Sequence, residues 1–350
     1  MNLKILILPG DGIGAEVTSA AVGVLKAVAK KFGHTLELSD GLLGGIAIHK
    51  TGTPLPQDTI DKALAADATL MGAVGLPEFD NTAPEKRPEK GLLGIRAALE
   101  VYANLRPVRA WPSLVESSPL KNHLVEGVDL LIVRELRGGL YYGTPRGIDG
   151  DRAVNTMVYT RPEIERVTRM AFRLARNRRK KLTSVDKSNV LEVSQLWGRV
   201  VNDVAKDFSD VELDHMLVDT CSMQLVLNPR RFDVLVMENM FGDILSDEGA
   251  VLAGSIGMLP SASLGESKGL YEPVHGSAPD IAGQNKANPL GAIGSVGAML
   301  EYTFGLMKEA EAVNVAIGKV LESGCVTADL RPQGKPATTE QVGRAVCEAI

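Results

Sequence analysis

The sequence predicts an α/β protein of two domains built on a largely parallel sheet. Short strand-like runs alternate with longer segments of helical periodicity along much of the chain, and such alternation is typical of strands joined by helical crossovers. With 350 residues, 45% of them hydrophobic, the chain is long enough for two cores. These two observations fix the fold class.

The individual elements follow from the same pattern. Runs of four or five residues suit strands, and longer segments with apolar residues at intervals of three and four suit helices. In chain order we expect strand 4–8, helix 16–32, strand 35–38, helix 60–66, strand 68–71, helix 163–177 and strand 182–185. Three prolines among charged residues at 76–91 predict a loop that leads into a helix at 92–100.

The pattern changes between residues 132 and 157. Short runs there are separated by Gly138, Gly139, Gly143 and Pro145, and by the turn-forming segment 147–150. Glycine and proline at this spacing favour tight turns over helices. We therefore expect an antiparallel hairpin or arm near residues 135–158, of a kind that often makes dimer contacts.

Composition excludes several classes of function. The net charge of -5 gives no electrostatic footprint for nucleic acid or an acidic membrane. The three cysteines have no CxxC spacing and suit a reducing compartment. The first residues lack the features of a signal peptide, and the longest apolar stretch, near 289–300, is too short and glycine-rich for a membrane span. We expect a cytoplasmic protein without nucleic-acid or membrane partners.

Asp243 and Asp247 form the first candidate site. They stand four residues apart, just after the apolar run 232–238, which suggests a buried strand. In a helix that begins at Gly242 both carboxylates would share one face and repel each other unless a cation lay between them. A hard divalent cation, Mg²⁺ or Mn²⁺, would suit these oxygen ligands. An acidic first turn that only complements the helix dipole is equally compatible with this pair alone.

Two segments could bind a nucleotide. The turn at 10–15 satisfies G-x-G-x-x-A after a strand, with Glu37 about 20 residues further on, which nominally matches a dinucleotide fingerprint. That pattern is weakly specific. The loop 270–283, followed by Asn288, combines an imidazole, a hydroxyl, a carboxylate and glycine-freed backbone donors. Such a loop could hold adenine and ribose without a Rossmann turn.

An ordered set of motifs makes the chain resemble the isocitrate/isopropylmalate β-decarboxylating dehydrogenases over essentially its whole length. The motifs are LPGDGIG at 8–14, LLGIR at 92–96, NLRP at 104–107, VREL at 133–136 with GGLY at 138–141, DKSNV at 186–190, Asp219 with MQL at 223–225, NMFGDILSD at 239–247 and the loop 272–283. The resemblance implies a two-domain isopropylmalate-dehydrogenase-like fold with a non-Rossmann cofactor site. Residues 1–101 and 254–350 would bind the cofactor, and 102–253 would bind substrate and metal and form the dimer.

The resemblance places the cofactor in the loop of the 270s. The resemblance gives the glycine-rich turn at 10–15 a structural role, together with one contact near the nicotinamide through Ile13. The other implied cofactor contacts are Glu272, His275, Gly276, Ser277, Ala278, Asp280, Ile281 and Asn288, with His275 and Asn288 at the adenine. Asp280 can accept both ribose hydroxyls and would repel a 2′-phosphate, so NAD⁺ is expected rather than NADP⁺.

Three arginines suit a substrate with two carboxylates and a hydroxyl. Arg96, Arg106 and Arg134 can each donate a bidentate pair of hydrogen bonds, and we expect them to converge across an inter-domain cleft. Asp219 ends a further strand-like run at 216–218. The resemblance makes it the third metal carboxylate, also next to the substrate. It makes Lys187 the base that takes the hydroxyl proton and Tyr141 the acid that protonates the carbon after CO₂ leaves. For Tyr141 alone, packing in an interface would be an equal alternative.

Family members are homodimers, so Lys187 and Asp219 are expected to enter the active site of the second subunit. Substrate choice would depend on Leu92 and Leu93, which replace the serine and asparagine of relatives that act on isocitrate, with Val190 nearby. Buried leucines would pack well against an isopropyl group but would leave a further carboxylate without a hydrogen-bond donor. Glu89 would repel that carboxylate.

The resemblance therefore implies NAD-dependent oxidation and metal-assisted β-decarboxylation of (2R,3S)-3-isopropylmalate to 4-methyl-2-oxopentanoate in leucine biosynthesis. A related substrate of the tartrate/malate or homoisocitrate type is the alternative within the family. From other classes, a metal-dependent decarboxylase without nicotinamide and a non-catalytic dimeric binding protein remain open. Arg137 departs from the threonine common at that position and puts charge close to the turn of Tyr141.

Overall fold

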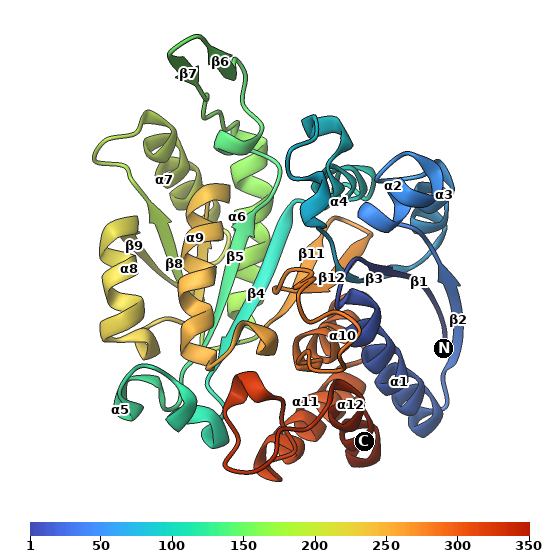
Figure 1. Cartoon of the computed structure of the whole chain (residues 1–350). Coiled ribbons are helices and arrows are strands. Elements are labelled where there is room, and N and C mark those ends of the chain that lie inside the picture. The colour runs from blue at the N-terminus through green and yellow to red at the C-terminus, as the bar shows by residue number, and fades with distance from the viewer. The chain divides into compact units, whose positions relative to one another are not determined.

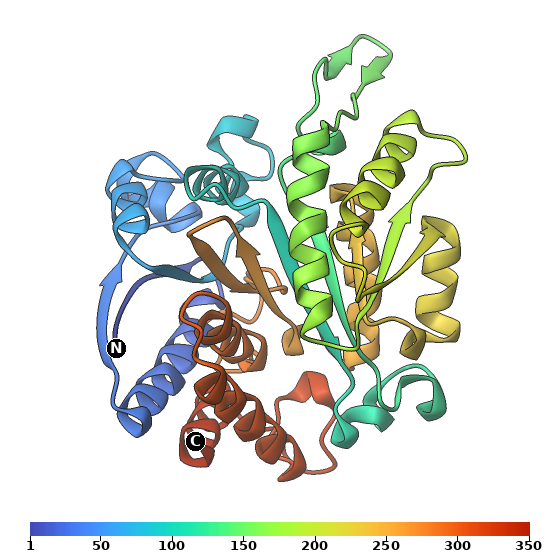
Figure 2. The same ribbon diagram turned by 180° about the vertical axis from the view of Figure 1, so that it is seen from behind.

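The computed structural model describes residues 1–350, which divide into two compact units. Unit 1 comprises Met1–Val101 with Gly254–Ile350, and unit 2 comprises Tyr102–Ala253. Unit 1 contains five strands and unit 2 contains seven, with helices packed against them (Figures 1 and 2). No helix combines the length and apolar character that a membrane span requires.

The strands of unit 1 are mostly parallel. Their order is β2 (Thr35–Asp40), β1 (Asn2–Gly10), β3 (Ala68–Ala73), β12 (Gly269–Pro273) and β11 (Pro260–Leu264). Only β11 runs antiparallel to its neighbour β12. Every residue of β3 and β12 is buried, as expected for central strands covered on both faces.

Four helices of unit 1 form two packed pairs. The helices α1 (Gly14–Phe32) and α10 (Leu290–Tyr302) contact the strands, and α11 (Met307–Glu322) and α12 (Thr339–Ala349) pack on them (Figure 1). Nearly every face of α10 is buried, which explains why its sequence is apolar all round. A second group contains α2 (Gly45–Thr51), α3 (Gln57–Ala65) and α4 (Pro88–Ala98).

The strands of unit 2 bring four chain segments to one edge. Their order is β4 (Ala103–Arg109), β5 (Asp129–Glu135), β10 (Val234–Met237), β8 (Lys181–Asp186) and β9 (Glu212–Leu217). The last four are parallel, and β4 runs antiparallel to β5. The carboxyl ends of the parallel strands therefore lie at the same edge, where open α/β sheets place their ligands.

The helices of unit 2 cover both faces of these strands. The helices α6 (Arg161–Arg176) and α7 (Glu192–Ala205) lie on one face, and α8 (Val218–Leu227) and α9 (Asn239–Ala250) lie on the other (Figures 1 and 2). A short helix, α5 (Asn122–Val125), precedes β5. An apolar core that includes Ile132, Leu235 and Phe241 fills the space between the strands and α8 and α9.

The expected hairpin is present. The strands β6 (Gly147–Asp149) and β7 (Arg152–Val154) pair antiparallel and project from the rest of unit 2 (Figure 1). Ile148, in the middle of β6, is the most exposed of the large apolar side chains, with 82% of its surface accessible.

The predicted α/β class with a mostly parallel sheet is confirmed, but three local predictions were wrong. The helix that carries the aspartate pair begins at Asn239 instead of Gly242, because the Glu238 carboxylate accepts the backbone N–H groups of Met240 and Phe241. The helix expected at 92–100 begins at Pro88, whose ring suits a first helical position. Asp219 does not end a strand but stands in the first turn of α8.

Candidate active site

The two aspartates of α9 face one point. Arg106, on β4, donates from Nη1 to Asp247 Oδ1 at 3.0 Å, and its Nη2 lies 3.8 Å from Asp243 Oδ1. A single guanidinium can reach both carboxylates only if they project from the same side of the helix. The spacing that suggested a cation site is therefore matched by the geometry, with an arginine at the position where the carboxylates meet.

Arg134 is fixed beside this pair. From β5 its Nε donates to Asn239 Oδ1 at 2.9 Å, and its Nη1 pairs with Asp243. Gly242 permits this approach, since a Cβ there would lie 2.6 Å from the Cγ of Arg134. Any other residue at 242 would push α9 away from β5 and separate Asp243 from its partner.

Tyr141 contacts the same carboxylate, that of Asp243. It ends the short 3₁₀ helix Gly139–Tyr141, and its hydroxyl donates to Asp243 Oδ2 at 3.0 Å. Partial burial, this hydrogen bond and the charge of Asp243 raise the pKa of Tyr141 above its usual value. Tyr141 therefore keeps its proton at neutral pH, as a proton donor must.

Lys187 and Asp219 form a separate pair within the chain. Lys187 follows the last residue of β8, and its Nζ lies 2.6 Å from Asp219 Oδ1. The hydrogen bond from Lys187 lowers the pKa of Asp219. No three acidic, histidine or cysteine side chains of the chain lie close enough together to hold a metal ion. Asp219 therefore does not join Asp243 and Asp247 within one subunit.

Sequence reasoning missed the polar residues that orient the arginines. The Asn104 side chain accepts from Arg106 Nε at 2.9 Å, and Ser246 accepts from its Nη1 at 2.7 Å. Asn239 does the same for Arg134. All three lie inside the motifs NLRP and NMFGDILSD, so their place in those motifs is the signal that could have identified them.

In unit 1 the glycine-rich turn supports the loop that follows β12. The N–H of Ile13 donates to the Ser277 carbonyl at 2.8 Å, and a Cβ at Gly12 would lie 2.0 Å from that same oxygen. The buried Asp11 carboxylate accepts N–H groups from Gly45, Ile46 and Gly75 at 2.8, 2.8 and 2.9 Å. The N–H of Ile13 and the carboxylate of Asp11 are thus engaged within the protein.

Replacing Gly12 by alanine tests this support. We expect a loss of roughly 2–4 kcal/mol in unfolding free energy, because φ is +55° and the new methyl group would meet a backbone carbonyl. Gly33→Ala is the matched control, since Gly33 has φ +75° with open space around it and should cost only about 1 kcal/mol. Urea unfolding measures both, and equal losses would contradict the contact with Ser277.

The loop itself offers unpaired groups. His275 Nδ1 lies 2.9 Å from the Gly276 carbonyl, whereas Nε2 is buried and has no partner. Burial lowers the pKa of His275, so its imidazole is neutral at neutral pH and can bind an adenine edge. The Asp280 carboxylate is exposed, and the space around Gly276 is open. These groups fit a nucleotide.

Asn288 differs from the rest of the expected cofactor residues. Its side chain is buried, donates to Asp329 Oδ2 at 2.9 Å and accepts the Leu290 N–H at 3.0 Å. Any contact of Asn288 with a nucleotide would therefore come from its backbone.

Arg96 and the two leucines share one face of α4. Arg96 Nη2 donates to Glu272 Oε1 at 2.6 Å, and the buried Nε of Arg96 has no partner. Leu92 is half-buried and Leu93 is 42% exposed, so the expectation of buried leucines is wrong for the single chain. Val190, in unit 2, is also exposed. The face of α4 around Arg96 thus presents apolar groups, and the unpaired donor of Arg96 lies beneath them.

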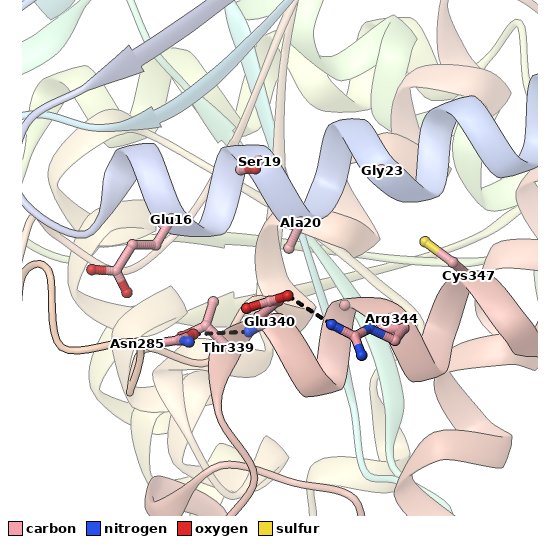
Figure 3. A pocket seen from close by; sticks show the side chains of 10 residues that line it. Glu16, Ser19, Ala20, Gly23, Asn285, Thr339, Glu340, Arg344 and Cys347 are labelled. Carbon is pink, nitrogen blue, oxygen red and sulfur yellow. Dashed lines mark hydrogen bonds and ion pairs between the residues drawn. The ribbon is translucent and has the colours of Figure 1, made fainter.

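A cavity of about 380 Å³ lies elsewhere in unit 1 (Figure 3). It runs between α1 and α12, where Ala20, Gly23 and Gly343 have small side chains or none. Glu340 and Arg344 pair along its edge at 2.7 Å. None of the predicted site residues lines it, so this cavity is not part of the candidate active site.

Comparison with known proteins finds relatives along nearly the whole chain. Residues 4–346 match the family described as isocitrate/isopropylmalate dehydrogenase. The chain is 59% identical over 338 residues to a 3-isopropylmalate dehydrogenase of Geobacillus kaustophilus, covering 95% of this chain and 91% of the relative. It is 55% identical over 355 residues to one of Priestia megaterium, covering 100% and 96%. The fold is similar to the crystal structure of isocitrate dehydrogenase from Methylococcus capsulatus, with a TM-score of 0.88, 37% identity and 99% of each chain covered.

Proposed function

Because the chain belongs to the isocitrate/isopropylmalate dehydrogenase family, we propose that it is a 3-isopropylmalate dehydrogenase of leucine biosynthesis. As a member of a dehydrogenase family it is an enzyme, an oxidoreductase. The proposed reaction is the NAD-dependent oxidation and β-decarboxylation of (2R,3S)-3-isopropylmalate to 4-methyl-2-oxopentanoate. The names of the relatives at 59% and 55% identity support this choice.

The observation that carries the substrate assignment is the pair Leu92 and Leu93 beside Arg96. Arg96 has a buried donor without a partner, which suits a substrate carboxylate. The adjacent leucines give that carboxylate apolar neighbours and no donor for a further one. An isopropyl substituent fits this chemistry, whereas the extra carboxylate of isocitrate would find no hydrogen-bond donor on these side chains and would face Glu89.

We assign the cofactor to the loop after β12. The unpaired His275 Nε2 and the exposed Asp280 carboxylate support NAD⁺, together with the remaining predicted contacts of this loop and Ile13. When bound, NAD⁺ would accept the hydride from C2 of the substrate.

Asp280→Lys tests the cofactor assignment. Loss of the ribose acceptor should raise the KM for NAD⁺ by at least about tenfold, while the new cation should favour the 2′-phosphate of NADP⁺. Steady-state kinetics with both cofactors measure the change. The control is Asp203→Asn, which alters an exposed ion pair with Arg161 in unit 2. Asp329→Asn would not serve as a control, because the Asp329 carboxylate accepts a hydrogen bond from Asn288. An unchanged ratio of NAD⁺ to NADP⁺ use would contradict the assignment.

We assign the metal ligands to Asp243 and Asp247, with Asp219 as the third carboxylate. Their fit rests on Arg106, whose cationic group contacts both α9 carboxylates, and on oxygen donors that Mg²⁺ and Mn²⁺ prefer. When bound, the cation would polarise the 2-oxo group so that the β-carboxylate can leave.

The chain's own side chains would hold the substrate and move two protons. Arg106 and Arg134 bind carboxylate oxygens. Lys187 Nζ, acting as the neutral amine after it has released its own proton, takes the proton of the C2 hydroxyl as the hydride leaves C2. The bond from C3 to the β-carboxylate then breaks, CO₂ departs, and the Tyr141 hydroxyl delivers a proton to C3.

We propose that the active enzyme is a homodimer with shared sites. The helices α8 and α9, which contact each other, expose the large apolar side chains Met223, Val226, Leu227 and Ile244, and Val251 just after α9 is exposed as well. A patch of this kind beside Asp219 and Asp243 suits a second copy of the chain. The exposed hairpin would add a contact. We place the enzyme in the cytoplasm, since all three cysteines are free thiols.

A panel of 3-substituted malates with each nicotinamide cofactor tests the proposal as a whole. We expect 3-isopropylmalate with NAD⁺ to give the highest kcat/KM. Faster turnover of isocitrate, homoisocitrate or tartrate would replace the substrate assignment. Release of CO₂ without any absorbance from reduced nicotinamide would favour a simple decarboxylase instead.

A further inference from the structure

Tyr159 connects three segments of the candidate site without taking part in it. It lies between β7 and α6 and is 6% exposed. Its hydroxyl donates to Glu135 Oε2 at 3.1 Å and accepts the backbone N–H of Asn239 at 3.0 Å. Glu135 ends β5, and Asn239 begins α9. One hydroxyl therefore fixes the start of α9 against the end of β5.

Glu135 extends this connection to the turn that carries Tyr141. Its carboxylate is fully buried and accepts the N–H groups of Arg137 at 2.9 Å and Gly138 at 2.7 Å. Arg166 lies 3.6 Å away and balances its charge. A buried carboxylate with several donors holds them firmly, because leaving any of them unpaired would be costly.

The ring of Tyr159 shapes the same turn. A Cβ at Gly138 would lie 2.3 Å from the ring, and one at Gly139 would lie 2.8 Å from the hydroxyl oxygen. The two glycines are thus required where the backbone crosses the tyrosine. On its other side the ring packs edge-on against Trp197, with centroids 5.6 Å apart, so the side chain cannot move aside.

Asn239 closes the network. Its amide donates to the carbonyls of Leu136 and Gly138, both at 3.2 Å, and its Oδ1 accepts from Arg134. The turn before Tyr141, the start of α9 and the guanidinium of Arg134 are therefore tied to one hub, formed by Glu135, Tyr159 and Asn239. At the far end of this network Tyr141 donates to Asp243.

We propose that Tyr159 is a positioning residue that sets the placement of Tyr141 relative to Asp243. It acts through Glu135 on the turn 136–139 and through Asn239 on α9, and it touches neither substrate nor cofactor. The proposal rests on the proposed function, because it assigns a task to the acid Tyr141. A displacement of about 1 Å in a proton donor can cost a large factor in rate.

The test compares Tyr159→Phe, Tyr141→Phe and the double variant. Tyr159→Phe keeps the ring and removes only the hydroxyl. We expect kcat to fall about tenfold with little change in the KM for NAD⁺. If Tyr159 acts through Tyr141, the double variant should be no slower than Tyr141→Phe alone, because effects that pass through one group do not add. Multiplying effects would overturn the proposal.

Two further readouts separate positioning from a loss of stability. Exchange of the C3 protons of 4-methyl-2-oxopentanoate with D₂O, followed by NMR, requires the Tyr141 proton transfer but no net oxidation, and it should slow in parallel with kcat. The Mn²⁺ affinity of the substrate-free enzyme should fall several-fold, since Asp243 shifts with α9. A wild-type exchange rate together with a wild-type Mn²⁺ affinity would reject the positioning role.

Tyr271→Phe is the matched control. Tyr271 is a fully buried tyrosine whose hydroxyl bonds Thr303 at 2.6 Å in unit 1, so its loss should lower the melting temperature without the kinetic changes. If Tyr159→Phe fails to fold, Glu135→Gln alters the same hub while keeping the ring, and it should show the same loss of kcat and of exchange. If wild type itself does not turn over 3-isopropylmalate, the proposed function fails, and the double-variant comparison is made on the malate that the panel identifies.

Discussion

Lys187→Ala is expected to lower kcat by about three orders of magnitude, the largest single effect among the candidate residues. The variant removes the proposed acceptor of the C2 hydroxyl proton, so hydride transfer would have to proceed without a base. The fold should survive, since Lys187 is on the surface end of β8 and its side chain makes only the ion pair with Asp219. The rate of nicotinamide reduction under saturating substrate measures the effect.

Lys206→Ala is the control for Lys187. Lys206 is an exposed lysine of unit 2 that also pairs with an aspartate, Asp203, at 2.9 Å, so its loss changes net charge equally but should leave kcat unaffected. A small amine added to Lys187→Ala should restore part of the activity, because it can occupy the vacated space and accept the proton. Activity of Lys187→Ala above half of wild type would rule out the assigned base.

Asp243→Asn is expected to weaken Mn²⁺ binding on the order of 100-fold and to reduce kcat accordingly. The substitution keeps the shape of the side chain but removes the charge that Arg134 and Arg106 pair with and that Tyr141 donates to. Titration with Mn²⁺ in the absence of substrate measures the affinity. Glu248→Gln, on the same helix but bonded to Ser222, should bind Mn²⁺ as wild type does, and similar affinities for the two variants would remove Asp243 from the ligand set.

Mixing these two inactive variants tests the shared sites. In a dimer of one Lys187→Ala chain and one Asp243→Asn chain, one active site would contain both substitutions and the other would contain neither. Random reassociation should then restore about one quarter of wild-type activity, because half of the dimers are mixed and each has one intact site. No recovery after proven exchange of subunits would mean that each chain builds its own site.

The fold was predictable where the signal is local. Alternating strands and helices indicated parallel strands, and the glycine and proline positions at 132–157 indicated the hairpin, since both depend on short-range patterning. Element ends were less predictable. The apolar run at 216–218 continues from β9 into α8, so hydrophobicity alone could not show that Asp219 is already helical. The start of α9 depends on Glu238 acting as a cap, which the sequence offers only as one acid among several.

The candidate site was predictable as a set of residues but not as a set of contacts. The motifs named Arg106, Arg134, Asp243 and Asp247, and the geometry brings these four together. Which arginine pairs with which aspartate depends on the register of β4 against β5 and on the approach of α9, neither of which a single sequence specifies. Tyr159 bonds Glu135, 24 residues before it, and Asn239, 80 residues after it. Nothing in the sequence around Tyr159 indicates such a role.

The position of Arg106 between the two aspartates has a practical consequence for handling the enzyme. Arg106 and Arg134 already pair with the two carboxylates of α9. Repulsion between Asp243 and Asp247 is therefore offset when no divalent ion is bound, and loss of the ion should not destabilise unit 2. Treatment with a chelator should therefore silence the enzyme reversibly. Arg106 acts as an internal counter-ion that keeps the two carboxylates in place during storage. The site can therefore bind the divalent cation again when it is added.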